Sequence, residues 1–189
     1  MKGLRAALPA RHAGSRRNFT WGHIGFRAAW ALAWLVFAAW TPPPLHGWRR
    51  LLLRLAGARL GAGARVYGSA RIWYPPHLAM GAGAVLGPHV VCTTMAPVTI
   101  GRLATVSQYA HLVTGTHRLD DPDFGLSAAP IVLGDHVWIA SGALVGPGVT
   151  VGEGAVLGAR GVAFRDLAPW TVHVGNPARP VRPRPRFAR

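Results

Sequence analysis

The side chains best suited to chemistry gather in one short segment of the chain. His117 closes the stretch Thr114-Gly115-Thr116-His117, and Asp120, Asp121 and Asp123, half of the six acidic residues, follow it. A neutral imidazole can take a proton from a hydroxyl group near pH 7 and later return it to a leaving group. A nearby carboxylate could orient the imidazole. This segment is therefore the first candidate for a catalytic site, with the three aspartates as candidate orienting groups.

A six-residue repeat surrounds this segment. Its clearest run of apolar positions is Leu133, Ile139, Val145, Val151 and Leu157, and four of these five are followed by glycine. A period of six fits neither a helix nor a simple two-sided strand, but it fits a short strand plus a corner, and three such units close a triangular coil. We expect each apolar residue to point into the prism. The glycine or small residue beside it is expected where the chain turns and needs either a positive φ or a close approach of two backbones.

The repeat also sets the organisation of the 189 residues. A mainly β solenoid is predicted over 58–178, with a loop insertion at 113–130 where the repeat breaks. A helical extension at 18–57 is predicted to precede it. Residues 1–17 form a basic tail, which we expect to be mobile, and residues 179–189 form a tail rich in Arg and Pro. Sites tend to lie on loops held by a rigid scaffold, so the insertion strengthens the case for His117.

Two helices are expected in the extension. Residues 24–40 carry apolar residues at helical spacing, namely Phe26, Trp30, Ala33, Phe37 and Trp40, before three prolines end the helix. Residues 45–55 place Trp48, Leu51, Leu52 and Leu55 at helical spacing, with Arg49, Arg50 and Arg54 flanking them. We expect this basic amphipathic helix to end at Gly57 and to cap the end of the solenoid core.

Two other interpretations of this region remain open. The uncharged part of the first helix would span about 20 Å, against ~30 Å of bilayer hydrocarbon, so it is too short to cross a membrane alone. Peripheral membrane contact through 24–55 stays an alternative to packing on the protein itself. Ser15-Arg16-Arg17-Asn18-Phe19 is similar to a twin-arginine export motif, but no small-residue cleavage site follows Trp40.

Composition narrows the classes of partner. The net charge is +15, and 20 of the 21 basic residues are arginine, so the surface attracts polyanions, including phosphorylated small molecules. No recognition helix or aromatic RNA-binding signature accompanies this charge, and we expect no nucleic-acid partner. The single cysteine, Cys92, is expected to be a small buried apolar residue in a protein of a reducing compartment.

Several stretches of the chain are distinctive. They are Asn18-Phe19-Thr20-Trp21-Gly22, Leu45-His46-Gly47-Trp48-Arg49-Arg50, Pro97-Val98-Thr99-Ile100-Gly101, Thr114-Gly115-Thr116-His117, Pro169-Trp170-Thr171-Val172 and Gly175-Asn176-Pro177-Ala178. With these stretches and the repeat, the chain resembles the bacterial hexapeptide-repeat acyltransferases, and within them the colanic acid biosynthesis acetyltransferases. The resemblance covers residues 18 to about 182. It implies a left-handed parallel β-helix, an exception to the usual right-handed crossover.

The same resemblance implies a set of site residues. His117 matches the general base of the family. Trp138 matches a tryptophan that lines the acetyl-donor or acceptor pocket, and Ser141 and Ala159 match contacts to the pantetheine arm of CoA. Basic positions near the CoA phosphates are matched by Arg165, Arg179 and Arg182. Relatives carry an acid directly after the histidine, where this chain has Arg118, and often Thr-Lys where it has Phe164-Arg165.

The function that the resemblance implies is O-acetyl transfer from acetyl-CoA to a hydroxyl of a sugar or polysaccharide precursor, in a homotrimer whose sites form between subunits. A cytoplasmic location, with peripheral contact on the inner membrane face as an option, follows from the need for acetyl-CoA. Carbonic anhydrases of the γ class share this coil and bind zinc, but His111 and His117 fall on neighbouring faces and no third ligand stands out, so we expect no metal. An amine or other non-sugar acceptor, or a non-catalytic β-helix binding module, remains an alternative.

Overall fold

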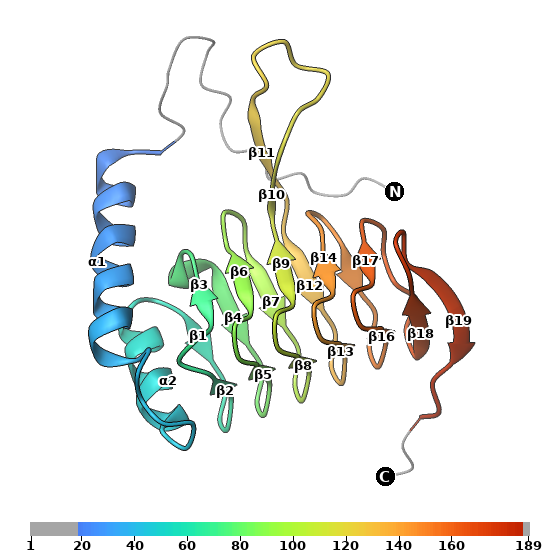
Figure 1. The fold of residues 1–189 in the computed structure, drawn as a ribbon, viewed down its shortest axis with the longest axis horizontal. Helices are drawn as coiled ribbons and strands as arrows, with labels where there is room; N and C mark the ends of the chain where they lie inside the picture. Colours follow the sequence, from blue (N-terminus) through green and yellow to red (C-terminus); the bar gives the residue numbers. More distant parts are fainter. Residues whose placement is uncertain (1–18, 187–189) are drawn as a thin grey trace.

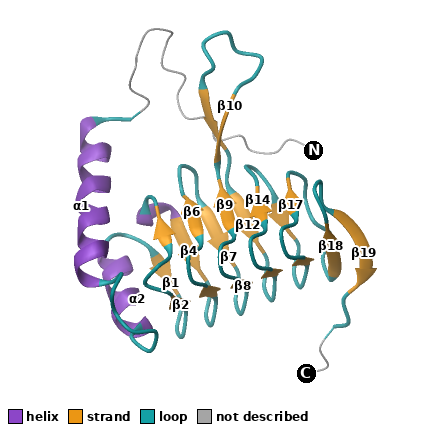
Figure 2. Ribbon diagram, in the orientation of Figure 1, coloured by secondary structure: helices purple, strands orange, loops and turns teal. Residues whose placement is uncertain are grey.

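The computed structural model describes residues 19–186 and shows a triangular parallel β-solenoid with two helices at its amino-terminal end (Figure 1). Short strands joined by tight corners make up nearly all of the solenoid, and the helices are confined to one end (Figure 2). The predicted tail at 1–17 and most of the twin-arginine pattern lie outside the described residues.

Three parallel sheets form the three sides of the prism. Side A contains β1 (Arg59–Leu60), β4 (Leu78–Met80), β7 (Val98–Ile100), β12 (Ile131–Leu133) and β15 (Thr150–Val151). Side B contains β2 (Arg65–Val66), β5 (Val85–Leu86), β8 (Thr105–Val106), β13 (Trp138–Ile139), β16 (Val156–Leu157) and β18 (Thr171–Val174), with the antiparallel β19 (Arg179–Pro183) at its end. Side C contains β3 (Arg71–Ile72), β6 (Val91–Thr93), β9 (His111–Val113), β14 (Leu144–Val145) and β17 (Val162–Ala163). A short 3₁₀ turn, Pro75–His77, lies between β3 and β4.

The inward positions of the six-residue repeat form the core. On side B, Leu86 pairs with Val106, Val106 with Ile139, and Ile139 with Leu157, and all four side chains have no exposed surface. Burying an aliphatic side chain of this size contributes roughly 1.5–3 kcal/mol. The predicted alternation of one inward residue per strand is therefore confirmed, and Cys92 is one of these buried inward residues, as expected.

At the corners, close approach of two backbones and a positive φ occur at different residues, although the sequence analysis assigned both to the residue beside the inward one. A Cβ built on Gly81, which follows the inward Met80, would lie 2.6 Å from the backbone nitrogen of Arg102 on the next coil, so this glycine allows close approach of two backbones. The positive φ falls two residues later, three after the inward residue, as at Leu103 (56°) and His136 (59°). Glycine beside the inward residue therefore reflects crowding between coils, and a side chain is accepted at the left-handed position.

The two helices close the first coil by hydrogen-bonding its outward carbonyl groups. The amides of this coil donate to the second coil, which leaves carbonyl oxygens along the end of the prism without a backbone partner. On α1 (Trp21–Phe37), the indole of Trp30 donates to Ile72 O at 2.8 Å and that of Trp34 to Gly68 O at 2.9 Å. Three arginines of α2 (His46–Leu55) cap the remaining carbonyls: Arg49 donates to Val66 O, Arg50 to Ala64 O and Arg54 to Leu60 O.

This capping corrects the predicted faces of both helices. Arg49 is fully buried, whereas Leu51 and Leu55 of the expected apolar face are 47% and 76% exposed. In and just after α1, Trp30 of the expected stripe is buried as predicted, but Phe37 and Trp40 are exposed, and Trp34 and Ala38 are buried in their place. The free carbonyl oxygens of the first coil need hydrogen-bond donors, and this need determines which helix residues face the solenoid. The hydrogen bonds to the first coil nevertheless confirm the predicted cap over the end of the core. Within residues 19–186, no helix is both long and apolar enough to cross a bilayer.

Candidate functional site

His117 lies on a hairpin that leaves the solenoid between sides C and A. The strand β10 (Gly115–His117) pairs antiparallel with β11 (Leu126–Ala128), and the hairpin projects well beyond the coils (Figure 1). Its root is fixed by the buried Thr114, whose hydroxyl donates to Thr93 O and accepts from Ala96 N at 3.1 Å. The predicted loop insertion is therefore an ordered hairpin that presents His117 away from the core.

The imidazole of His117 is held by Phe124 across the hairpin loop. Its Nδ1 lies 2.8 Å from the carbonyl oxygen of Phe124, and the two rings stack with centroids 4.5 Å apart and an interplanar angle of 8°. Because a carbonyl can only accept, Nδ1 carries the proton in the neutral ring and Nε2 keeps a free lone pair. The side chain is exposed. The arrangement can thus offer a proton acceptor of fixed tautomer to a group that approaches from solvent.

The three candidate aspartates make contacts within the hairpin loop. Asp121 forms an ion pair with Arg118 at 3.1 Å, and its other oxygen accepts from Asp123 N at 3.0 Å. No hydrogen bond joins His117 to Asp120, Asp121 or Asp123 in the described hairpin. The carboxylate of Asp121 stabilises the loop whose carbonyl holds the imidazole, and no sequence pattern points to a main-chain acceptor at Phe124.

Trp138 and its neighbours lie on side B. The indole nitrogen of Trp138 donates to Ser107 Oγ at 2.9 Å, and about half of the side chain is exposed. In the parallel sheet it stands between Thr105 and Val156. The tryptophan therefore presents a fixed ring edge on the outer surface of the prism, as a pocket wall would require.

Ser141 and Ala159 occupy equivalent positions on successive coils, at the corner between sides B and C. Arg160 N donates to Ser141 O at 3.0 Å, and Gly142 N donates to Gln108 O at 3.0 Å. The hydroxyl of Ser141 also donates to Gln108 O at 3.2 Å. Gln108, which the sequence analysis did not select, thus precedes Ser141 and Ala159 in a line with one residue per coil, about 4.8 Å apart. Such a line suits an elongated ligand that runs parallel to the prism axis.

The predicted phosphate-binding arginines separate into two places. Arg165 and Arg179 line one hollow of about 390 Å³ at the carboxy-terminal end of the solenoid, together with Phe164 and Asp166. Asp166 accepts from Thr150 N at 2.7 Å, and neither arginine forms an ion pair in the described part of the chain. Arg182 is opposite Val172 on β19, outside this hollow. Two of the three arginines therefore converge and the third does not.

One chain does not bring His117 together with Trp138, Ser141 or Ala159. The hairpin leaves the edge between sides C and A, whereas Trp138 lies on side B and Ser141 and Ala159 on the edge between B and C. The width of side C separates the two groups. Cys92 lies in the core, where burial raises the pKa of its thiol to about 12, as for an inert buried cysteine.

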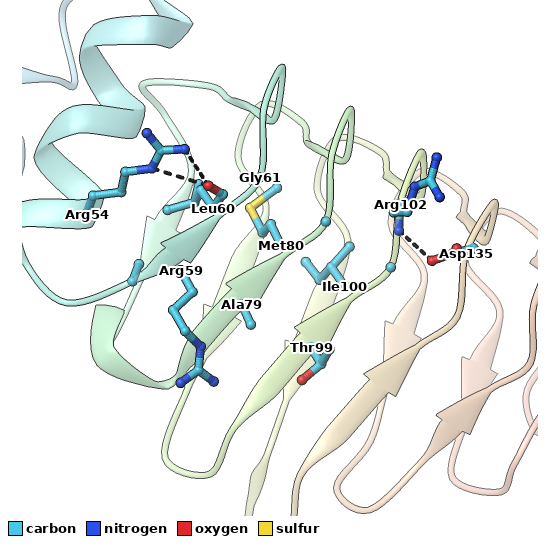
Figure 3. Close-up of a pocket in the computed structure, with 13 residues that line it drawn as sticks. Arg54, Arg59, Leu60, Gly61, Ala79, Met80, Thr99, Ile100, Arg102 and Asp135 are labelled. Atoms are coloured by element: carbon cyan, nitrogen blue, oxygen red, sulfur yellow. Dashed lines mark hydrogen bonds between the residues drawn. The ribbon is translucent and has the colours of Figure 1, made fainter.

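A larger hollow, of about 730 Å³, lies on side A and contains none of the predicted site residues (Figure 3). Two of its polar side chains serve the backbone: Arg54 donates to Leu60 O, and Asp135 accepts from Arg102 N at 2.7 Å. No histidine lines it. Among residues 19–186, moreover, no three His, Cys, Asp or Glu side chains lie close enough together to hold a metal ion.

Comparisons with known proteins agree on the repeat. The family model "Bacterial transferase hexapeptide (six repeats)" matches residues 130–162. The chain is 41% identical over 155 residues to the protein assigned as the colanic acid biosynthesis acetyltransferase WcaF of Escherichia coli K12, covering 82% of this chain and 85% of that protein.

Two solved structures extend the comparison to the fold. The hexapeptide-repeat acetyltransferase VCA0836 of Vibrio cholerae, in complex with acetyl-CoA, superposes with a TM-score of 0.81 at 24% identity, over 90% of this chain and 93% of that chain. A maltose O-acetyltransferase of Clostridium difficile 630 superposes with a TM-score of 0.79 at 24% identity, over 88% of this chain and 90% of that chain. These likenesses confirm the predicted left-handed β-helix class.

Proposed function

Because this chain belongs to the hexapeptide-repeat acetyltransferases, the family of WcaF, we propose that it transfers the acetyl group of acetyl-CoA to a hydroxyl group of a sugar or polysaccharide precursor. The observation that carries the proposal is the hydrogen bond from His117 Nδ1 to the Phe124 carbonyl, which leaves Nε2 as a proton acceptor. The acceptor class is supported by WcaF and by the maltose O-acetyltransferase among the structural neighbours.

The reaction then proceeds by general-base catalysis. Nε2 of His117 takes the proton of the acceptor hydroxyl as its oxygen attacks the carbonyl carbon of the thioester. The new C–O bond forms, the C–S bond breaks, and the imidazolium returns the proton to the departing thiolate of CoA. The Phe124 carbonyl accepts the Nδ1–H bond throughout and keeps the ring aimed at the acceptor.

On the donor side, the line Gln108, Ser141 and Ala159 offers a surface for the pantetheine arm beside Trp138. Arg165 and Arg179 offer guanidinium groups for phosphates, because arginine can bind two phosphate oxygens at once. A net charge of +15 favours the approach of an anionic donor from solution.

The complete site forms between neighbouring copies in a homotrimer. This part of the proposal is supported by the separation of His117 from Trp138 and Ser141 across side C, which leaves each group incomplete in one chain. Mixing two inactive variants tests it. His117→Ala and Ser141→Trp chains, unfolded together and refolded, should recover about a quarter of the wild-type rate, since each site draws one element from each of two chains. Recovery of no activity in mixed trimers would contradict a shared site.

The function itself is tested by transfer assays with acetyl-CoA and a panel of saccharides, with mass spectrometry of the products. His117→Ala should lower kcat by about 10² to 10⁴ while leaving the Kd of acetyl-CoA unchanged. A variant that keeps most of its turnover would remove His117 from the mechanism. Transfer to amino sugars alone, at nitrogen, would favour the amine-acceptor alternative, and absence of any transfer would favour a binding module.

The proposed use of acetyl-CoA supports a cytoplasmic location. Peripheral contact with the inner membrane face through residues 24–55 is supported by exposed apolar side chains on both helices and between them, among them Leu32, Leu35, Trp40 and Leu55. Sedimentation with anionic liposomes tests this contact. Wild-type protein should co-sediment, and a Leu32→Gln, Leu35→Gln, Trp40→Gln variant should remain in the supernatant.

A further inference from the structure

A column of residues in the left-handed conformation follows the corner between sides B and C, with one residue on each coil from the second to the fifth. They are His89 (φ 55°), Tyr109 (60°), Gly142 (67°) and Arg160 (55°). Backbone hydrogen bonds link successive coils here, and Tyr109 N donates to Pro88 O at 3.0 Å. Each member of the line Gln108, Ser141 and Ala159 directly precedes one residue of this column. The column therefore lies beside the surface proposed for the pantetheine arm.

The rings of His89 and Tyr109 form a stack along this column. Their centroids are 4.9 Å apart, about one coil repeat of ~4.8 Å, and the interplanar angle is 6°. Parallel rings cannot approach face to face closer than roughly 3.5 Å, so most of the displacement between the centroids is perpendicular to the ring planes. Because the two residues lie one coil apart on the same corner, this displacement follows the prism axis. The stack thus ends in a ring face of Tyr109 that is turned toward the fourth coil.

The next position of the column leaves that ring face open. Gly142 has no side chain, and a Cβ built on it would lie 3.5 Å from Cγ of Arg160, an ordinary contact. Tyr109 is 58% exposed although His89 covers its other face. His89 is held in turn by its backbone, whose N–H donates to Ser69 Oγ at 3.1 Å. The ring of Tyr109 is therefore open to a ligand on the side of the fourth coil and supported on the side of the second.

The donor proposed for this corner has a fixed direction along it. Its phosphates are assigned to Arg165 and Arg179, which line the hollow at the carboxy-terminal end of the solenoid. The thioester of the same molecule then lies toward the other end of the line, between Ser141 on the fourth coil and Gln108 on the third. An acyl group attached to that sulfur points at the open face of the Tyr109 ring.

We propose that the ring of Tyr109, backed by His89, is a stop that restricts the donor to short acyl groups. The methyl of an acetyl group fits over Gly142, whereas each further methylene has to displace a ring that its neighbour supports. This inference rests on the proposed function for the identity of the donor. It concerns donor selectivity alone, and the proton transfer assigned to His117 is the same for acyl groups of any length.

Comparison of two donors tests the stop. Transfer to one saccharide acceptor and calorimetric titration of the full-length protein are each measured with acetyl-CoA and with butyryl-CoA. The wild-type protein should prefer acetyl-CoA by about tenfold or more in kcat/KM. Tyr109→Ala should narrow this preference to about threefold or less, mainly by improving the use of butyryl-CoA. Tyr109→Phe keeps the ring and should restore the wild-type preference.

Three further variants complete the comparison. His89→Ala should relax the preference part of the way, because Tyr109 loses the ring that supports it. Tyr109→Asn also removes the ring and suits the left-handed conformation, so it repeats the test if Tyr109→Ala does not fold. Leu103→Ala is the matched control, since Leu103 has a φ of 56° and is 52% exposed at the corner between sides A and B. Its donor preference should equal that of the wild type.

The other outcomes separate this inference from the proposed function. Equal use of both donors by the wild type, or an unchanged preference in both Tyr109→Ala and Tyr109→Asn, would overturn the stop and leave the proposed function intact. A raised KM for the saccharide in these variants, without a change in donor preference, would assign the ring stack to the acceptor instead. If the wild-type protein neither binds acetyl-CoA nor transfers its acetyl group, the proposed function and this inference fail together.

Discussion

The carbonyl oxygen of Phe124 holds His117 at 2.8 Å through Nδ1, and the ring of the same residue stacks on the imidazole. One residue thus fixes both the tautomer and the plane of the ring. Phe124 itself has a φ of 50°, a conformation that side chains other than glycine adopt infrequently. The loop accepts this conformation at the place where the histidine must be positioned.

Phe124→Ala should therefore lower kcat by roughly tenfold while leaving the KM for acetyl-CoA unchanged, because the carbonyl remains and the ring contact is lost. Steady-state kinetics with a fixed saccharide acceptor measures kcat and this KM. Leu119→Ala, at an exposed position of the same loop, is the control and should behave as wild type. A shift in KM alone would assign Phe124 to donor binding instead.

The two groups of arginines should differ in donor binding. Arg165→Ala and Arg179→Ala together should weaken acetyl-CoA at least tenfold, since the two share one hollow and each charged hydrogen bond to phosphate contributes about 1.5–3 kcal/mol. Arg182→Ala should have little effect because its side chain lies outside that hollow. Calorimetric titration with acetyl-CoA and free CoA measures these affinities. Equal losses of affinity at all three positions would show that the phosphates bind elsewhere.

Loss of the buried guanidinium at the capped end should destabilise the fold. Arg49 donates to Val66 O, to the hydroxyl and carbonyl of Thr41, and to the carbonyls of Pro42 and Pro43. Arg49→Leu leaves these acceptors without a donor and should cost about 3 kcal/mol or more in unfolding free energy. Arg59→Leu, at an exposed position, should change it by less than about 0.5 kcal/mol. Denaturant unfolding of the two variants provides the comparison.

Crowding between coils predicts a second stability difference. Gly81→Ala would force a Cβ to 2.6 Å from Arg102 N and should destabilise the solenoid by roughly 2 kcal/mol or more. Gly22→Ala, in the first turn of α1, has nothing within 4 Å of the new Cβ and should stabilise by about 0.5–1 kcal/mol. The thermal midpoints of the two variants should thus move in opposite directions. Equal decreases in both midpoints would show that crowding between coils does not cause the loss at Gly81.

Stability should also depend on pH through two histidines. Burial is the largest cause that lowers the pKa of both His23 and His46 below the ordinary value of 6.5. As the pH falls through 6.5, the unfolded chain binds protons that the folded chain does not, so stability present above 6.5 is lost progressively below it. The thermal midpoint should decrease as the pH is lowered from 7.5 to 5.5. The double variant His23→Gln, His46→Gln should show a smaller decrease. An unchanged pH dependence in that variant would exclude these two groups.

The solenoid and its core could be predicted from the sequence because the repeat records one geometric constraint many times. Each inward position must be apolar, and chance does not produce five consecutive matches such as Leu133 to Leu157. The helices could also be located, since their apolar spacing and flanking prolines are local signals. Their orientation could not, because burial of Arg49 depends on carbonyls of the first coil that a one-dimensional pattern does not contain.

The candidate site also contains residues that could be predicted from the sequence and residues that could not. His117 could be selected because it stands in the break of the repeat, and Ser141 and Ala159 because they fall one full coil apart. The orienting group could not, since a carbonyl at Phe124 acts through backbone conformation and any residue type carries a carbonyl. Gln108 was missed because the inserted hairpin displaces the register between it and Ser141, although it occupies the same corner.

The two ends of the prism differ in what covers them. The carbonyls of the first coil are occupied by indole and guanidinium donors, and the last strand, β19, contains Pro180 and Pro183, which have no N–H to offer. A parallel solenoid with open ends would template further rungs and grow into a fibre. Addition of further rungs is thus blocked at the first coil and, on side B, hindered at the last strand, which disfavours growth of the solenoid end to end.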